Sequence, residues 1–130
     1  MSYDLYFWRQ TKDLSFLPTK VVDLLSQDSP IDGVTAFPRN TVRALFKKHF
    51  PEIVDGDFQL DWEGAGSYFQ VGFNHASETD VHLIVVNCGY ELLNSNETMN
   101  RIIEVAADLG CALYDPQTNE RYQQPEPKTG

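Results

Sequence analysis

The chain has 130 residues, the length of one ordinary domain, and 42% of them are hydrophobic, which is enough to bury a core and excludes extensive disorder. It contains 19 Asp and Glu against 10 Lys and Arg, so its formal net charge is −9 at pH 7. A surface of that sign disfavours nucleic acid and anionic membranes as partners and favours basic proteins.

The first third of the chain predicts a strand, a helix and a loop. Residues 3–8 are apolar on both alternating faces, which is typical of a central strand. Pro18 suits the first position of a helix, and apolar residues with helical spacing continue the helix to residue 25. Residues 31–38 contain a glycine and lie between prolines, so we expect a loop there.

A second amphipathic helix is predicted from the apolar spacing that runs up to Phe50, and Pro51 ends it. The other face of this helix repeats Arg39, Arg43 and Lys47 at intervals of four residues. We interpret that repeat as a basic helix face in contact with solvent.

Three strands are expected next. Residues 58–63 alternate between inward apolar and outward polar side chains, and residues 68–73 alternate again after the glycine-rich residues 64–66. Two such runs around a turn predict a β-hairpin. Residues 81–86 are apolar on both sides, so they form a well-covered third strand of an antiparallel meander.

The third helix has the clearest signals. Asn94 as N-cap with Glu97 three residues later resembles a capping box, and Gly110 stands at the C-terminal end. The expected apolar stripe consists of Met99, Ile102, Ile103 and Ala106. Residues 111–114 predict a last short strand, followed by a turn over residues 115–118.

The order β-α-α-β-β-β-α-β predicts an α+β fold, with a mostly antiparallel four- to five-stranded sheet and the helices packed on one face. One domain is expected over residues 1–122, and residues 123–130 are expected to be a disordered tail. Cys88 and Cys111 fall in expected buried segments and are predicted to be reduced core thiols. Because no secretory signal and no apolar run of bilayer length occur, we expect a cytoplasmic protein.

No motif for a metal, cofactor or catalytic group is complete. Residues 55–61 begin like a calcium loop, but Gln59 and Leu60 stand where a ligand and a glycine are needed, so only a weak divalent site stays open as an alternative. Residues 64–69 have two glycines of a dinucleotide motif, yet a strand follows them instead of a helix. His49, His75 and His82 have no chelating spacing, and we expect structural or surface roles for them. We therefore expect no cofactor, no metal and no enzyme.

All ten Lys and Arg lie outside residues 49–100, and nine acidic residues lie inside this stretch. Carboxylates around an aromatic ring on the outward face of the hairpin suit Lys and Arg of a partner. The predicted partner-binding residues are those of the hairpin face and of the flanking acidic turns: Asp55, Asp57, Gln59, Asp61, Glu63, Tyr68, Gln70, Glu78 and Asp80. Simple solubility is the alternative explanation of the charge.

Residues 3–8 (YDLYFW), 62–69 (WEGAGSYF) and 106–118 (AADLGCALYDPQT) give the chain a resemblance to small bacterial immunity proteins of contact-dependent growth inhibition and other polymorphic toxin systems. The resemblance covers most of the chain but carries over no functional residue. It implies a cytoplasmic antidote that binds the C-terminal domain of a cognate toxin, which is often a basic nuclease. Direct binding of nucleic acid or membrane is not expected, and a general adaptor domain or, less favoured, a small enzyme are the alternatives.

Overall fold

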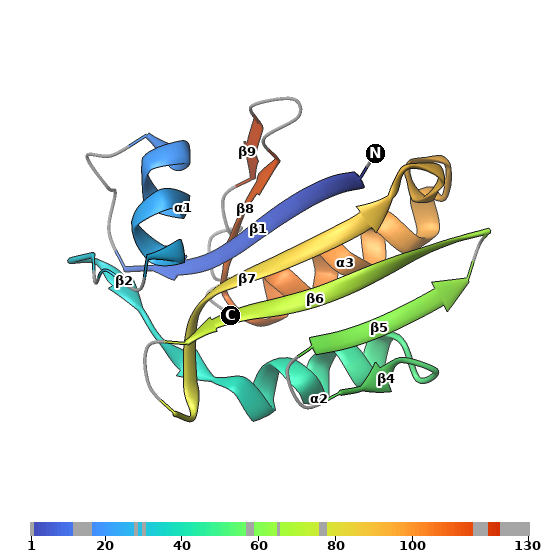
Figure 1. The fold of residues 1–130 in the computed structure, drawn as a ribbon, viewed down its shortest axis with the longest axis horizontal. Coiled ribbons are helices and arrows are strands. Elements are labelled where there is room, and N and C mark those ends of the chain that lie inside the picture. Colours follow the sequence, from blue (N-terminus) through green and yellow to red (C-terminus); the bar gives the residue numbers. More distant parts are fainter. Residues whose placement is uncertain are drawn as a thin grey trace, which may run out of the picture.

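A computed structural model describes residues 2–11, 17–27, 29, 31–56, 59–64, 66–75, 78–115 and 120–122. Asp57, the expected turn at residues 116–118 and the expected tail at residues 123–130 lie outside these residues. Three α-helices and an antiparallel sheet make up the fold, so the predicted α+β class is confirmed (Figure 1).

Nine strands form the sheet in the described part of the chain, more than the four to five expected. The main order is β4-β5-β6-β7-β1-β8-β9, while β2 pairs with β1 and β3 pairs with β7. Their bounds are β1 Ser2–Gln10, β2 Val34–Thr35, β3 Phe37–Pro38, β4 Val54–Asp55, β5 Gln59–Gly64, β6 Ser67–His75, β7 Asp80–Gly89, β8 Ala112–Asp115 and β9 Glu120–Tyr122. The predicted meander is β5-β6-β7. The additional strands, β2, β3, β4 and β9, have two or three residues each, too few to show an alternating pattern.

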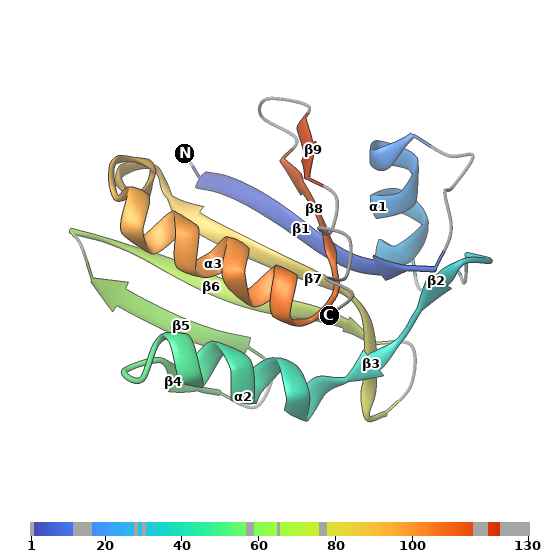
Figure 2. The ribbon, with the colours of Figure 1, turned by 180° about the vertical axis from the view of Figure 1, so that it is seen from behind.

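The three helices lie on both faces of the sheet, which corrects the expectation of one face. The helices are α1 Pro18–Ser26, α2 Arg39–His49 and α3 Asn96–Asp108, and a 3-10 helix spans Tyr90–Asn94. Figure 2 shows α2 and α3 across one face, while α1 packs on the other. None of the helices in the described part is long and apolar enough to cross a membrane.

Strand β1 explains the two-sided cover. Leu5 and Phe7 point into the main core between the sheet and the α2–α3 layer. Trp8 points the other way and packs with Val21 and Leu25 of α1 in a second, smaller cluster. A strand that is apolar on both faces needs apolar cover on both faces, so α1 completes the second layer.

The start of α3 differs from the predicted capping box by one residue. Ser95 is the N-cap, and its hydroxyl accepts a hydrogen bond from the Thr98 amide at 3.4 Å. Asn94 belongs to the preceding 3-10 helix, and the Glu97 carboxylate pairs with Arg101 one turn later at 2.7 Å. Two adjacent residues of capping type allow either start, and packing decides between them.

At the end of α3 the predicted glycine turn is confirmed, whereas the predicted apolar face is only partly correct. Gly110 has a φ of +71°, the left-handed conformation that ends many helices. Arg9 donates a hydrogen bond to the Leu109 carbonyl at 2.9 Å, which places a cation at the negative end of the helix dipole. Ile103, expected in the apolar stripe, is 39% exposed, and Val105 is buried.

Both cysteines are buried free thiols, as predicted. Cys88 lies in β7, and Cys111 directly precedes β8. Burial raises the pKa of each thiol to about 12, because the thiolate would lose its hydration.

Candidate protein-binding surface

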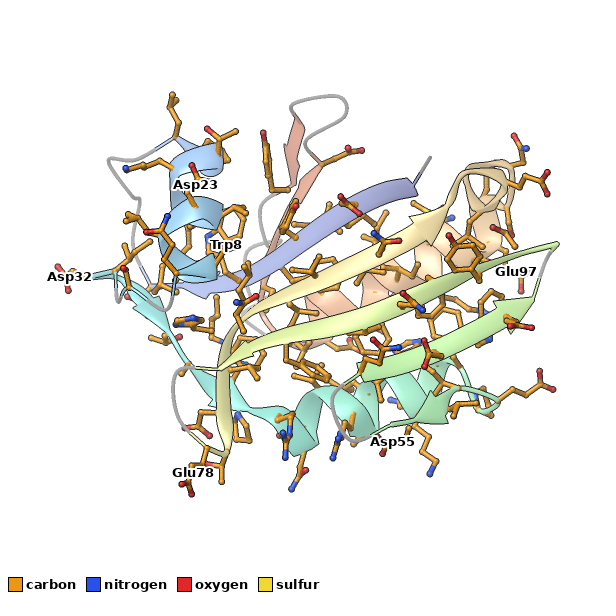
Figure 3. All side chains as sticks on the ribbon, viewed as in Figure 1. Trp8, Asp23, Asp32, Asp55, Glu78 and Glu97 are labelled. Atoms are coloured by element: carbon orange, nitrogen blue, oxygen red, sulfur yellow. The ribbon has the colours of Figure 1, made fainter. Side chains whose placement is uncertain are left out.

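The sheet face opposite α2 and α3 is only half covered. Helix α1 lies over the end of this face that contains Trp8 and Leu83 (Figure 3). No described element covers the other end, which we call the open face. It consists of the outward-pointing residues Asp4, Val54, Gln59, Asp61, Glu63, Tyr68, Gln70, Gly72 and Asn87. Tyr6 and Val85 form its border with α1, because they pack against the α1 cluster.

Strand register places the polar residues of the open face side by side. Asp61 of β5 lies opposite Gln70 of β6, and Glu63 lies opposite Tyr68. The first row continues across the sheet, because Gln70 pairs with Asn87 and Asn87 pairs with Asp4. At about 4.8 Å between neighbouring strands, the row from Asp61 to Asp4 is roughly 14 Å long.

Hydrogen bonds hold both ends of this row. The Gln59 amide donates to the two carboxylate oxygens of Asp61, at 3.1 and 3.2 Å. At the other end the Asn87 amide donates to Asp4 Oδ1 at 2.7 Å. In these contacts the donor to each carboxylate is a neutral side-chain amide.

A surface hollow of about 450 Å³ lies over the β5–β6 hairpin. Asp61, Glu63, Tyr68 and Gln70 are among the side chains that line it. The Tyr68 side chain is 42% exposed, so an aromatic ring stands beside the carboxylates in contact with solvent. The hollow thus combines carboxylate, amide and aromatic groups on a hydrogen-bonded sheet.

The open face carries negative charge without basic residues from its central strands. Strands β4 to β7 contain no Lys or Arg. Arg9 of β1 points to the helix side, where its guanidinium lies 4.9 Å from the centre of the Phe37 ring. A cationic partner can consequently meet Asp61 and Glu63 without displacing a Lys or Arg of these strands.

Asp55, a predicted binding residue, lies on the helix side of the sheet. It pairs in register with the buried Leu60, and its carboxylate forms a 3.2 Å ion pair with Arg43 of α2. Arg43 also donates to the Gly56 carbonyl at 2.9 Å, and its side chain is only 22% exposed. The expected solvent-exposed basic face of α2 is therefore partly used to hold the β4 edge.

Glu78 and Asp80, also predicted to bind the partner, lie at the far end of the hairpin formed by β6 and β7. Figure 3 shows Glu78 well separated from Asp55. His75, where β6 ends, lies five positions after Gln70, which corresponds to roughly 17 Å along the strand. Of the predicted residues, the structure brings together Gln59, Asp61, Glu63, Tyr68 and Gln70.

The sequence reasoning missed Asp4, Tyr6 and Asn87 on the same face. Their signal was the alternation of β1, in which Asp4, Tyr6 and Trp8 share one side. Burial, followed by the nearby charges of Asp4, Tyr114 and Asp23, raises the pKa of Tyr6. Tyr6 thus lies at the border between the open face and the α1 layer.

Two histidines have structural contacts. His49 bridges α2 and α3, with Nδ1 3.6 Å from a Glu104 oxygen and Nε2 3.0 Å from an Asp108 oxygen. His82 is buried, and its Nε2 lies 3.0 Å from the Leu25 carbonyl oxygen. Because a carbonyl can only accept, His82 Nε2 donates this bond and ties α1 to β7. Among the residues that the structure describes, no group of three or more His, Cys, Asp or Glu is placed to hold a metal ion.

Comparison with protein-family models, curated proteins and solved structures finds no match to this chain.

Proposed function

We propose that the chain is a cytoplasmic immunity protein that binds a basic toxin domain, such as a nuclease, and neutralises it through the open face. The observation that carries this proposal is the uncovered half of the sheet. There Asp4, Asp61 and Glu63 are presented by strands β1 and β5, and β4 to β7 supply no Lys or Arg.

Charge and rigidity both support such a role. A surface that binds nucleic acid is basic, so a protein face with clustered carboxylates attracts it from a distance and can occupy it. Strands β5, β6, β7 and β1 are hydrogen-bonded to one another, so Asp61 and Gln70 are already positioned before a partner arrives. Positioned groups lose less conformational entropy on binding than groups on free loops.

The test is growth rescue during co-expression with the candidate toxin domain, together with measured affinity between the purified proteins. The reference chain should restore growth. The double variant Asp61→Lys plus Glu63→Lys should lose rescue and weaken binding at least about 100-fold, since it places two cations against a basic partner.

Glu52→Lys plus Glu78→Lys is the matched control. It changes the net charge by the same amount at two exposed residues away from the open face. This control should keep rescue and lower affinity by less than about fivefold, through long-range attraction alone. Equal losses in the two double variants would refute a binding role of the open face, and failure of the reference chain to rescue growth would refute the immunity function.

A further inference from the structure

Gly72 lies on the open face near its border with α1, because its neighbour Val85 packs beside the α1 cluster and Asn74, two residues further along β6, donates a hydrogen bond to the Ser26 carbonyl of α1. Its φ angle is outside the left-handed region, so the backbone of β6 does not require glycine there. A Cβ added at Gly72 would meet only the Val85 carbonyl oxygen, at an ordinary contact distance of 3.9 Å. A glycine inside a strand weakens the strand and marks a bulge, a bend or a site where a ligand or another backbone approaches closely. The register shift in β6 lies between Asn74 and His75, beyond Gly72, so we favour a close approach as the explanation.

Two other glycines of the hairpin region have an internal explanation. A Cβ at Gly64 would collide with the Trp62 ring, and a Cβ at Gly89 would collide with Ser67 and approach the Tyr68 ring. Those glycines make room for side chains of the same chain. Gly72 makes room on the outside, because Phe69 and Val71 face the core and Gln70 and Gly72 face away from it.

The surroundings of Gly72 define what can fit there. Gln59 lies directly opposite on β5, and Val85 lies opposite on β7. Two residues further along β5 is Asp61, whose two oxygens each accept from the Gln59 amide. A carboxylate can accept about four hydrogen bonds, so Asp61 keeps acceptor sites for a two-pronged donor.

We infer that Gly72 is the seat of an arginine side chain of the partner, a proposal that rests on the proposed function. The aliphatic part of the arginine lies over Gly72 beside Val85, and its planar guanidinium donates two parallel hydrogen bonds to Asp61. Lysine fits less well, because its ammonium is a compact and strongly hydrated charge that cannot make the paired contact.

The probe is a capped triarginine peptide, compared with capped trilysine of equal charge, titrated into the isotope-labelled protein at low salt and followed by NMR. Triarginine should shift the amide signals of Gln59, Asp61, Gln70 and Gly72 in a saturable way and bind at least threefold more tightly than trilysine. Gly72→Val, which fills the seat without altering charge, should weaken triarginine binding at least fivefold.

Ala44→Val is the control for added bulk, because Ala44 is an exposed residue of α2 on the helix side. It should leave triarginine binding unchanged. Thermal unfolding should show that Gly72→Val is at least as stable as the reference chain, since valine suits a strand. Equal binding of the two peptides, or an unaffected Gly72→Val variant, would overturn the arginine seat.

The two proposals fail separately. Loss of rescue in Asp61→Lys plus Glu63→Lys, together with unaltered triarginine binding in Gly72→Val, would retain the immunity role and reject the seat. A specific triarginine site on a chain that rescues no toxin-expressing cell would retain the seat and reject the immunity role.

Discussion

The two ends of the outer sheet face are formed by the same strands but have opposite surfaces. Where β1 and β7 pass under α1, they present Trp8 and Leu83, both buried. A few residues away they present Asp4 and Asn87, which are only partly buried and are joined by a hydrogen bond. The difference shows that α1 covers the apolar part of the face. The part that α1 leaves uncovered is mostly polar and does not need to be buried.

The largest expected effect comes from removing the apolar anchor at the covered end. Trp8→Ala should lower the free energy of unfolding by about 3–5 kcal/mol, because it leaves a cavity between α1 and the sheet. Urea unfolding of the purified protein measures this loss. Gln70→Ala at the open end is the matched control and should change stability by less than about 0.5 kcal/mol. Similar losses at both ends would remove the distinction between them.

A smaller decrease in the free energy of unfolding is expected when the hydrogen bond that holds α1 against the sheet is removed. His82→Phe keeps an aromatic ring but leaves the Leu25 carbonyl without the Nε2 donor, which should cost about 1–3 kcal/mol. Hydrogen exchange should then rise in α1 and stay unchanged in α3. His49→Gln, at the more exposed contact between α2 and α3, should cost less than about 1 kcal/mol.

At the open end, Asp4→Asn tests whether the polar row extends beyond the predicted hairpin. It should lower the association rate with the basic partner roughly two- to fivefold at low salt, with little change in dissociation. The difference from the reference chain should shrink at high salt, where the Debye length is about 3 Å. Stopped-flow measurements at two salt concentrations would show this, and a salt-independent difference would argue against electrostatic attraction.

The smallest effect is a pH dependence at the border residue Tyr6. Its pKa is raised in the folded chain, so the folded state keeps the phenol proton at a pH where the unfolded state has lost it. This contribution to stability is complete below the ordinary tyrosine pKa of 10.0 and is lost as pH rises through the higher folded value. Tyr6→Phe should therefore flatten the decline in stability above pH 10, as measured by urea unfolding at several pH values. An unchanged slope would contradict the prediction.

Local patterns predicted the hairpin well, and with it the core of the candidate site. Alternation over residues 58–63 and 68–73 predicted that Asp61, Glu63, Tyr68 and Gln70 share the outward face of a hairpin. The structure adds the register, in which Asp61 lies opposite Gln70 and Glu63 opposite Tyr68. Such pairings need only two strands that are adjacent in sequence.

Non-local arrangements could not be read in the same way. Asn87 is hydrogen-bonded to Asp4 because β1 pairs with β7, although the two residues are more than 80 positions apart in the sequence. The orientation of Asp55 depends on β4, which has two residues and no alternating pattern. The apolar stripe of α1 indicates only that the helix packs on some apolar surface. Which face of the sheet it covers depends on the strand order, which the local pattern does not give.

A face of one sign also affects how copies of the chain meet one another. In a symmetric pair built on the open face, Asp61 and Glu63 of one copy would oppose the same residues of the other, and like charges at an interface cost free energy. Pairing of two copies through the open face is therefore electrostatically disfavoured. In the proposed function, the same carboxylates that attract a basic partner also oppose pairing of two copies through this face.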